Sequence, residues 1–102
     1  MAAAARIEAQ EGGVLAVSGV LEFATVTALA GQAEGLLPAS GPLYIDLGGV
    51  EHTDSAGLAL LVHWLRRAHH EGRLLEFRNV PVQLLEMARV SRLDNLLPLR
   101  AA

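Results

Sequence analysis

The first part of the chain holds a run of alternating apolar and polar residues followed by a short apolar run. Residues 7–10 read IEAQ and residues 14–17 read VLAV, and the turn-forming residues Glu11, Gly12 and Gly13 stand between them. Alternation is typical of β-strands, and a glycine-rich turn of this length connects antiparallel neighbours. The pattern therefore predicts an N-terminal β-hairpin.

The spacing of apolar residues then changes to steps of three and four, which places side chains on one face of a helix. In the segment 26–37 these residues are Val26, Leu29, Ala30, Ala33, Leu36 and Leu37. Proline and glycine at residues 38–42 end this predicted helix. Residues 43–47, LYIDL, are apolar apart from Asp46. They predict a central strand that is covered on both faces.

A second helix is predicted from Gly57 to about Glu71, with Gly72 as its C-terminal stop. Its apolar stripe consists of Leu58, Leu61, Val62, Leu65 and Ala68. Residues 74–78 predict another strand, with Glu76 and Arg78 facing out, and Pro81 opens a helix over residues 82–90. Leu93, Leu96 and Leu97 form a short closing apolar segment.

This order of elements predicts an α/β fold in one domain, residues 1–102. Strands that alternate with helices form a mostly parallel sheet with the helices packed against it. We expect a mixed sheet of about four strands.

Composition excludes several function classes. The chain has no cysteine and no lysine, which excludes thiolate metal sites, cysteine nucleophiles and Schiff-base chemistry. Its net charge of −3 has the wrong sign for binding nucleic acid or anionic lipid by general electrostatics. The N-terminus lacks the apolar core of a signal peptide, and no apolar run is long enough to span a bilayer. We expect a cytoplasmic protein with no cofactor, no nucleic-acid partner and no direct membrane insertion.

The residue Ser55 lies between an acid and a small residue ahead of an apolar run. Three roles are possible for it: a nucleophile, a phosphate acceptor, or the residue that starts a helix. A hydrolase elbow requires G-x-S-x-G, but Thr53 stands two positions before Ser55. Metal binding by His63 and His70 lacks a completing carboxylate, so solvent-facing histidines are expected. In the structural reading, Asp54 or Ser55 caps the helix. The same helix N-terminus also favours negative charge, so an exposed hydroxyl there is well placed for phosphate or a partner.

Residues 43–47 (LYIDL) and 50–58 (VEHTDSAGL) resemble the signature of STAS domains, the module shared by anti-sigma factor antagonists and sulphate transporters. In that family a strand ending in Asp-Leu leads through a loop to Asp-Ser/Thr-x-Gly-Leu at the start of a helix. The resemblance implies a non-enzymatic docking module. It puts Ser55 at the regulatory hydroxyl or phosphoacceptor position and Thr53, Asp54 and Gly57 in the supporting loop.

Two branches of the family fit. Residues 57–65 and 93–98 resemble the small STAS subunit of Mla-type phospholipid-transport ABC complexes, although that subunit can carry Thr-Gly where this chain has Ser-Ala. This branch implies an accessory subunit that binds the cytoplasmic ATPase, peripheral to the inner membrane, and that serves outer-membrane lipid asymmetry. The alternative is an anti-sigma factor antagonist, whose partner kinase phosphorylates Ser55.

The residues Leu60 and Trp64 fall outside the predicted core stripe, one turn apart on the helix. The polar residues His63, Arg67 and His70 lie beside them. A tryptophan with a nearby arginine is the composition that binding hot spots favour. We therefore expect Leu60, His63, Trp64 and Arg67 to bind the partner. The alternative is that neighbouring helices of the same chain bury Trp64.

Overall fold

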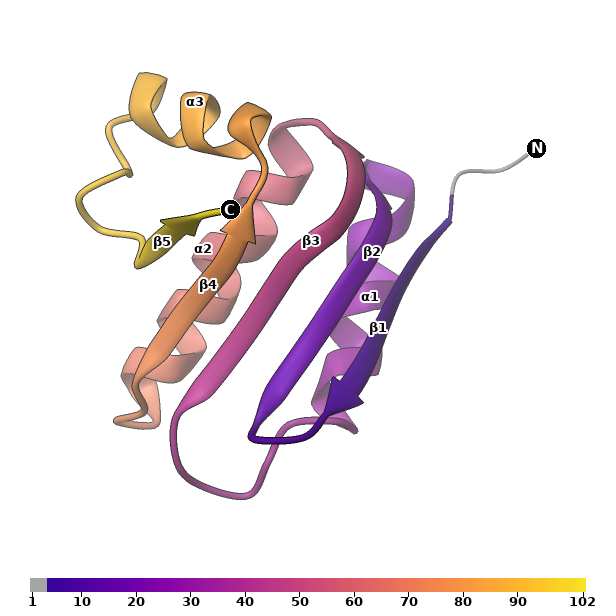
Figure 1. Ribbon diagram of the computed structural model, residues 1–102, viewed down its shortest axis with the longest axis vertical. Coiled ribbons are helices and arrows are strands. Elements are labelled where there is room, and N and C mark those ends of the chain that lie inside the picture. Colours follow the sequence, from indigo (N-terminus) through magenta and orange to yellow (C-terminus); the bar gives the residue numbers. More distant parts are fainter. Residues whose placement is uncertain (1–3) are drawn as a thin grey trace.

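One five-stranded sheet organises the computed structural model, which describes residues 4–102. The strand order follows the chain, β1-β2-β3-β4-β5 (Figure 1). The strands are β1 (Ala5–Gln10), β2 (Val14–Leu21), β3 (Leu43–Thr53), β4 (Leu75–Val80) and β5 (Leu99–Ala101). The strands β1 and β2 pair antiparallel and all other neighbours pair parallel. The predicted hairpin and mostly parallel sheet are therefore confirmed.

Three helices connect the parallel strands: α1 (Phe23–Glu34), α2 (Ser55–His70) and α3 (Val82–Val90). The helices α1 and α2 lie behind the sheet in Figure 1, and α3 crosses its upper end. Each helix begins directly after a strand of the parallel part of the sheet. The N-termini of the helices therefore gather at the carboxyl end of the strands, which is where Ser55 lies.

The sheet is larger than the sequence predicted, because β5 is present and β3 continues through Gly48 and Gly49 to Thr53. A glycine pair reads as a turn, but here it allows the parallel pairing with β2. A Cβ atom on Gly49 would lie 2.7 Å from the Cβ of Ser18. Gly49 is therefore needed for the close approach of the two strands.

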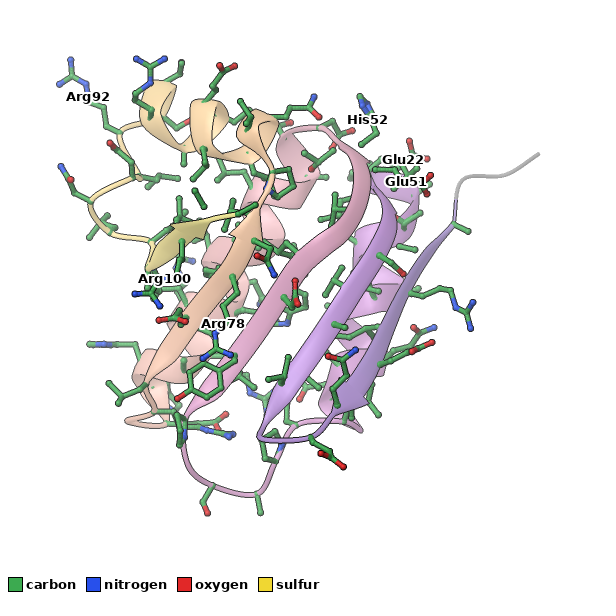
Figure 2. All side chains as sticks on the ribbon, in the orientation of Figure 1. Glu22, Glu51, His52, Arg78, Arg92 and Arg100 are labelled. Carbon is green, nitrogen blue, oxygen red and sulfur yellow. The ribbon has the colours of Figure 1, made fainter. Side chains whose placement is uncertain are left out.

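The expectation that both faces of β3 are covered is wrong. The side chains of Leu43, Ile45 and Leu47 are buried in the core, whereas Tyr44 and Asp46 are half-buried. No helix of residues 4–102 covers the face that points toward the viewer in Figure 1. Figure 2 shows Arg78 on this open face. Its guanidinium carbon lies 3.9 Å from the centroid of the Tyr44 ring. Cation–π stacking shields the ring in place of a second helical layer.

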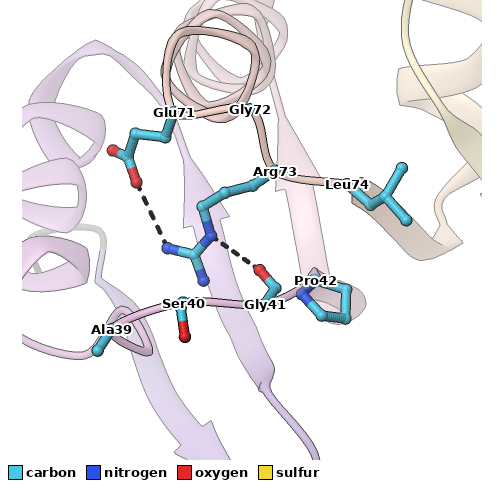
Figure 3. A pocket seen from close by; sticks show the side chains of 8 residues that line it. All are labelled: Ala39, Ser40, Gly41, Pro42, Glu71, Gly72, Arg73 and Leu74. Carbon is cyan, nitrogen blue, oxygen red and sulfur yellow. Dashed lines mark hydrogen bonds and ion pairs between the residues drawn. The ribbon is translucent and has the colours of Figure 1, made fainter.

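The end of α2 is tied to the loop between α1 and β3 by Arg73. Gly72 adopts a positive φ of 67°, as expected for a C-terminal stop. The Arg73 guanidinium then donates from Nε to the carbonyl of Gly41 at 2.9 Å and from Nη1 to that of Pro38 at 3.0 Å. Gly41, Gly72 and Arg73 border a cavity of about 650 Å³ (Figure 3). Arg73 thus fixes the end of the molecule opposite Ser55.

Within residues 4–102, no helix combines the length and the apolar character needed to cross a membrane.

Candidate functional site

The hydroxyl group of Ser55 is exposed at the first position of α2. Asp54 is the residue that caps this helix, because its Oδ1 accepts the backbone N–H of Ala56 at 2.8 Å. No hydrogen bond involves the Ser55 side chain in the described part of the chain. The capping reading therefore applies to Asp54, and the fold leaves the Ser55 hydroxyl available for an external contact.

The residues Thr53 and Gly57 fix the junction between β3 and α2. Thr53 is 1% exposed, and its Oγ1 donates to the carbonyl of Asp54 at 3.1 Å. A Cβ atom on Gly57 would overlap Thr53 Oγ1 and lie 3.1 Å from the Leu21 Cβ. Only glycine therefore allows the first turn of α2 to pack so closely on Thr53 and Leu21.

The side chain of Gln83 also supports this junction, which sequence reasoning missed. Its Oε1 accepts the backbone N–H of Thr53 at 3.2 Å. Gln83 belongs to α3 and lies far from Thr53 in the sequence, so no local pattern indicates the contact. The hydrogen bond connects the Ser55 end of α2 to the first turn of α3.

The predicted exposure of Leu60 and Trp64 is wrong, because these side chains are 4% and 3% exposed. The buried face of α2 consists of Gly57, Leu58, Leu60, Leu61, Trp64 and Ala68. The helix α2 packs against the sheet and against both α1 and α3, so the buried stripe of α2 is wider than the one predicted. Leu60 and Trp64 belong to the core, and they present no ridge to a partner.

Of the two remaining predicted partner-binding residues, His63 is exposed and Arg67 is engaged within the chain. Arg67 Nε pairs with Glu71 Oε2 at 2.6 Å, and its Nη1 pairs with Glu34 of α1. The hydrogen bonds that Arg67 donates to Glu71 and to Glu34 raise the pKa of Arg67, and accepting the bond from Arg67 lowers the pKa of Glu71. Arg67 therefore joins α1 to α2, whereas the partner role of His63 stays a prediction.

Shallow apolar grooves flank the N-terminal half of α2. The α1–α2 groove has a volume of about 390 Å³ and is lined by Phe23, Val26, Thr27, Ala30, Ala56, Ala59, Leu60 and His63. The α2–α3 groove has a volume of about 350 Å³ and is lined by Ser55, Leu58, Gln83, Glu86, Met87, Val90 and Ser91. Ser55 lines the α2–α3 groove, and its neighbour Ala56 lines the α1–α2 groove. Surface of this kind is typical of protein docking sites.

The site holds no arrangement typical of nucleophilic catalysis. Activation of a serine requires a base within hydrogen-bonding distance, and no histidine of residues 4–102 forms a hydrogen bond with Ser55. The histidines His52, His63, His69 and His70 are all exposed. In the described residues, no group of three potential ligands is placed to hold a metal ion. The chemistry of the site is thus that of an exposed hydroxyl beside apolar surface.

The chain is similar to proteins of known family and structure. A family model described as "Mlab, STAS domain" matches residues 4–98. A chain in the ATP-bound Vtrans2 conformation of the Acinetobacter MlaFEDB complex is 30% identical, with a TM-score of 0.66 over 88% of this chain and 96% of that one. No curated protein matches.

Two anti-sigma factor antagonists share the fold. The antagonist from Mycobacterium paratuberculosis has a TM-score of 0.71 at 24% identity, over 99% of this chain and 87% of that one. The antagonist SpoIIAA in its unphosphorylated form has a TM-score of 0.71 at 13% identity, over 97% and 89% of the two chains.

Proposed function

The chain belongs to the STAS-domain family of the Mlab type, and from that premise we propose that it is a non-catalytic accessory subunit of a phospholipid-transport ABC complex. It binds the cytoplasmic ATPase subunit through the face headed by Ser55. The similarity to a chain of the Acinetobacter MlaFEDB complex supports this assignment. The subunit is then held at the inner membrane by its partner, in a system that maintains outer-membrane lipid asymmetry.

The observation that carries the proposal is the free hydroxyl of Ser55 between two apolar grooves. Asp54 already caps α2, so the fold has no use for the Ser55 side chain. Ser55 itself lines the α2–α3 groove, and the next residue, Ala56, lines the α1–α2 groove. A partner that covers this end buries apolar surface and gains a hydrogen bond at its centre.

Binding supports the ATPase by population shift. A subunit that binds one conformation or assembly state of the ATPase better than another shifts the equilibrium toward the better-bound state. Each tenfold preference requires about 1.4 kcal/mol of differential contact. This role needs no nucleotide site in the chain itself.

The test replaces Ser55 by aspartate and measures the dissociation constant for the purified ATPase subunit. A carboxylate in the first turn is compatible with the helix dipole, so Ser55→Asp leaves the fold intact. The negative charge then lies where the Ser55 hydroxyl contacts the ATPase, and binding weakens. Ser40→Asp is the matched control, because Ser40 is an exposed serine in the loop at the opposite end of the molecule. Undiminished binding by Ser55→Asp contradicts the docking role of Ser55.

A second function, the anti-sigma factor antagonist, is favoured by the exposure of the same hydroxyl. A phosphate on Ser55 adds about −1.5 to −2 charge beside Asp54 and so changes the docking face without removing a structural hydrogen bond. In this case the chain binds an anti-sigma factor kinase, and phosphorylation by that kinase releases it. Binding of the ATPase but of no such kinase excludes this alternative.

A further inference from the structure

We propose that the α1–α2 groove receives a helix of the partner protein that carries bulky apolar residues beside arginine or lysine. This inference rests on the proposed function, because it specifies the part of the ATPase surface that docks at the Ser55 end. It replaces the predicted ridge of Leu60 and Trp64 with another apolar surface.

The anchor of this surface is Phe23. Its side chain is 87% exposed at the first position of α1, on the wall of the groove. When a partner covers an aromatic side chain that was exposed to solvent, the free energy falls and binding is stabilised. Phe23 lies outside the buried core, so the fold does not require it.

The floor of the groove is made of small residues, and this shape fits a helix. Ala30, Ala56 and Ala59 line it above the buried side chain of Leu60. From Phe23 to Ala30 the groove follows α1 for about 10 Å, or two helical turns. This length accommodates apolar anchors at positions i, i+3 or i+4, and i+7 of one docked helix.

The charges at the open end of the groove specify a basic partner. Glu22 precedes Phe23, and the pairing of Leu21 with Thr53 brings Glu22 next to Asp54. Figure 2 shows Glu22 and Glu51 together at this end of the molecule. None of these three carboxylates forms an ion pair within residues 4–102. One helical turn beyond Ala30 and His63, which line the groove, Glu34 is paired with Arg67, so the carboxylates without an ion pair lie at the entrance.

This acidic entrance argues against an anionic lipid surface as the occupant, because phosphate groups are repelled there. It argues equally against a second copy of the chain that docks by the same face, because the like carboxylates then meet. A helix with arginine or lysine next to its apolar anchors can place the anchors in the groove and pair its basic side chains with the carboxylates at the entrance.

The experiment measures dissociation constants for the purified ATPase subunit at low and high salt. We expect Phe23→Ser to weaken binding at least about tenfold, as for a hot-spot aromatic residue. Ala59→Trp fills the groove and weakens binding to a similar extent. Glu51→Arg weakens binding about threefold or more and flattens its salt dependence.

Matched controls carry the same chemical changes elsewhere. Leu74→Ser removes an exposed apolar side chain at the opposite end, Ala28→Trp enlarges the side of α1 next to β1, away from α2, and Glu11→Arg reverses a charge in the β1–β2 turn. These variants bind like the wild type. Circular dichroism confirms that every variant keeps the fold.

The outcomes separate the two proposals. If the wild type binds the ATPase and the three groove variants bind equally well, the groove inference is overturned and the proposed function stands. If the wild type does not bind the ATPase, the proposed function fails. The groove is then tested with a synthetic leucine–arginine helical peptide against its leucine–glutamate counterpart. Preference for the basic peptide, lost in Phe23→Ser, supports the inference, and equal binding overturns it.

Two further measurements name the other occupants. Sedimentation of the isolated chain tests for a dimer, and a dimer that Phe23→Ser dissociates assigns the groove to a second copy. Flotation with phosphatidylethanolamine–phosphatidylglycerol vesicles tests for lipid. Vesicle binding that depends on Phe23 assigns the groove to a membrane. Either result overturns the proposal.

Discussion

Replacing Gly57 by alanine adds one methyl group where the first turn of α2 contacts β3. That methyl group overlaps Thr53 Oγ1, and it lies 3.1 Å from the Leu21 Cβ. Thr53 and Leu21 are 1% and 0% exposed, so neither side chain has free space to move into. The substitution therefore pushes the Ser55 end of α2 away from the sheet.

The magnitude follows from two opposing effects. Overpacking of a buried site costs about 1–3 kcal/mol. Alanine recovers about 0.5–1 kcal/mol relative to glycine within a helix. We expect a net loss of about 1–2 kcal/mol in the free energy of unfolding, which lowers the melting temperature of a domain of this size by about 4–15 °C. Chemical denaturation with a circular dichroism readout measures it.

Gly31→Ala is the matched control. Gly31 lies in α1, and a Cβ atom there has no neighbour within 4 Å. This substitution keeps the helical gain without the overlap, so it stabilises the chain by about 0.5–1 kcal/mol. The two variants thus differ in sign. If Gly57→Ala is as stable as Gly31→Ala, the packing argument for the Ser55 junction is refuted.

Two more predictions concern α2. Trp64→Ala lowers the free energy of unfolding by about 3–5 kcal/mol, because the side chain is only 3% exposed. The control His63→Ala leaves the free energy of unfolding unchanged, because His63 is exposed. A small loss for Trp64→Ala in urea denaturation would disprove its core position. The Arg67 hydrogen bond lowers the pKa of Glu71 below its ordinary value of 4.5, so the contribution of Glu71 to stability is present above pH 4.5 and is lost as the pH falls through the folded-state pKa. Glu71→Gln removes this part of the acid loss in a pH series of melting temperatures, and an unaltered pH profile would contradict the assignment.

The alternating and helical patterns predicted most of the fold, because the residues that end elements are strong signals. Gly72 ends α2 at a positive φ, and Pro81 precedes α3. The continuation of β3 was missed because the predicted strand ended at Leu47, ahead of Gly48 and Gly49. Their role in close strand pairing depends on β2, which a local pattern does not contain.

The open face of the sheet was also missed, although the sequence holds a signal for it. Tyr44 and Asp46 alternate with buried residues, and their partners on β4 are Glu76 and Arg78. Two neighbouring strands with polar residues in register indicate a face without a helical layer. Reading each strand alone conceals this.

The candidate site was predicted in part. Its hydroxyl and supporting loop depend on local sequence, and Ser55, Asp54 and Gly57 lie together at the start of α2. The burial of Trp64 depends on how α2 meets α1 and α3. Because apolar residues follow one another without a break from Leu58 to Val62, more than one core stripe fits the first half of α2. Packing between the elements decided which stripe is buried.

Hydrogen exchange of the chain with and without the ATPase subunit tests the central claim most directly. If the partner covers the Ser55 end, exchange slows in residues 22–30 and 55–63 on binding and stays unchanged in residues 5–10 and 75–80 of the sheet. Protection of the sheet segments, with residues 22–30 and 55–63 unaffected, would place the partner on the open face and contradict the account.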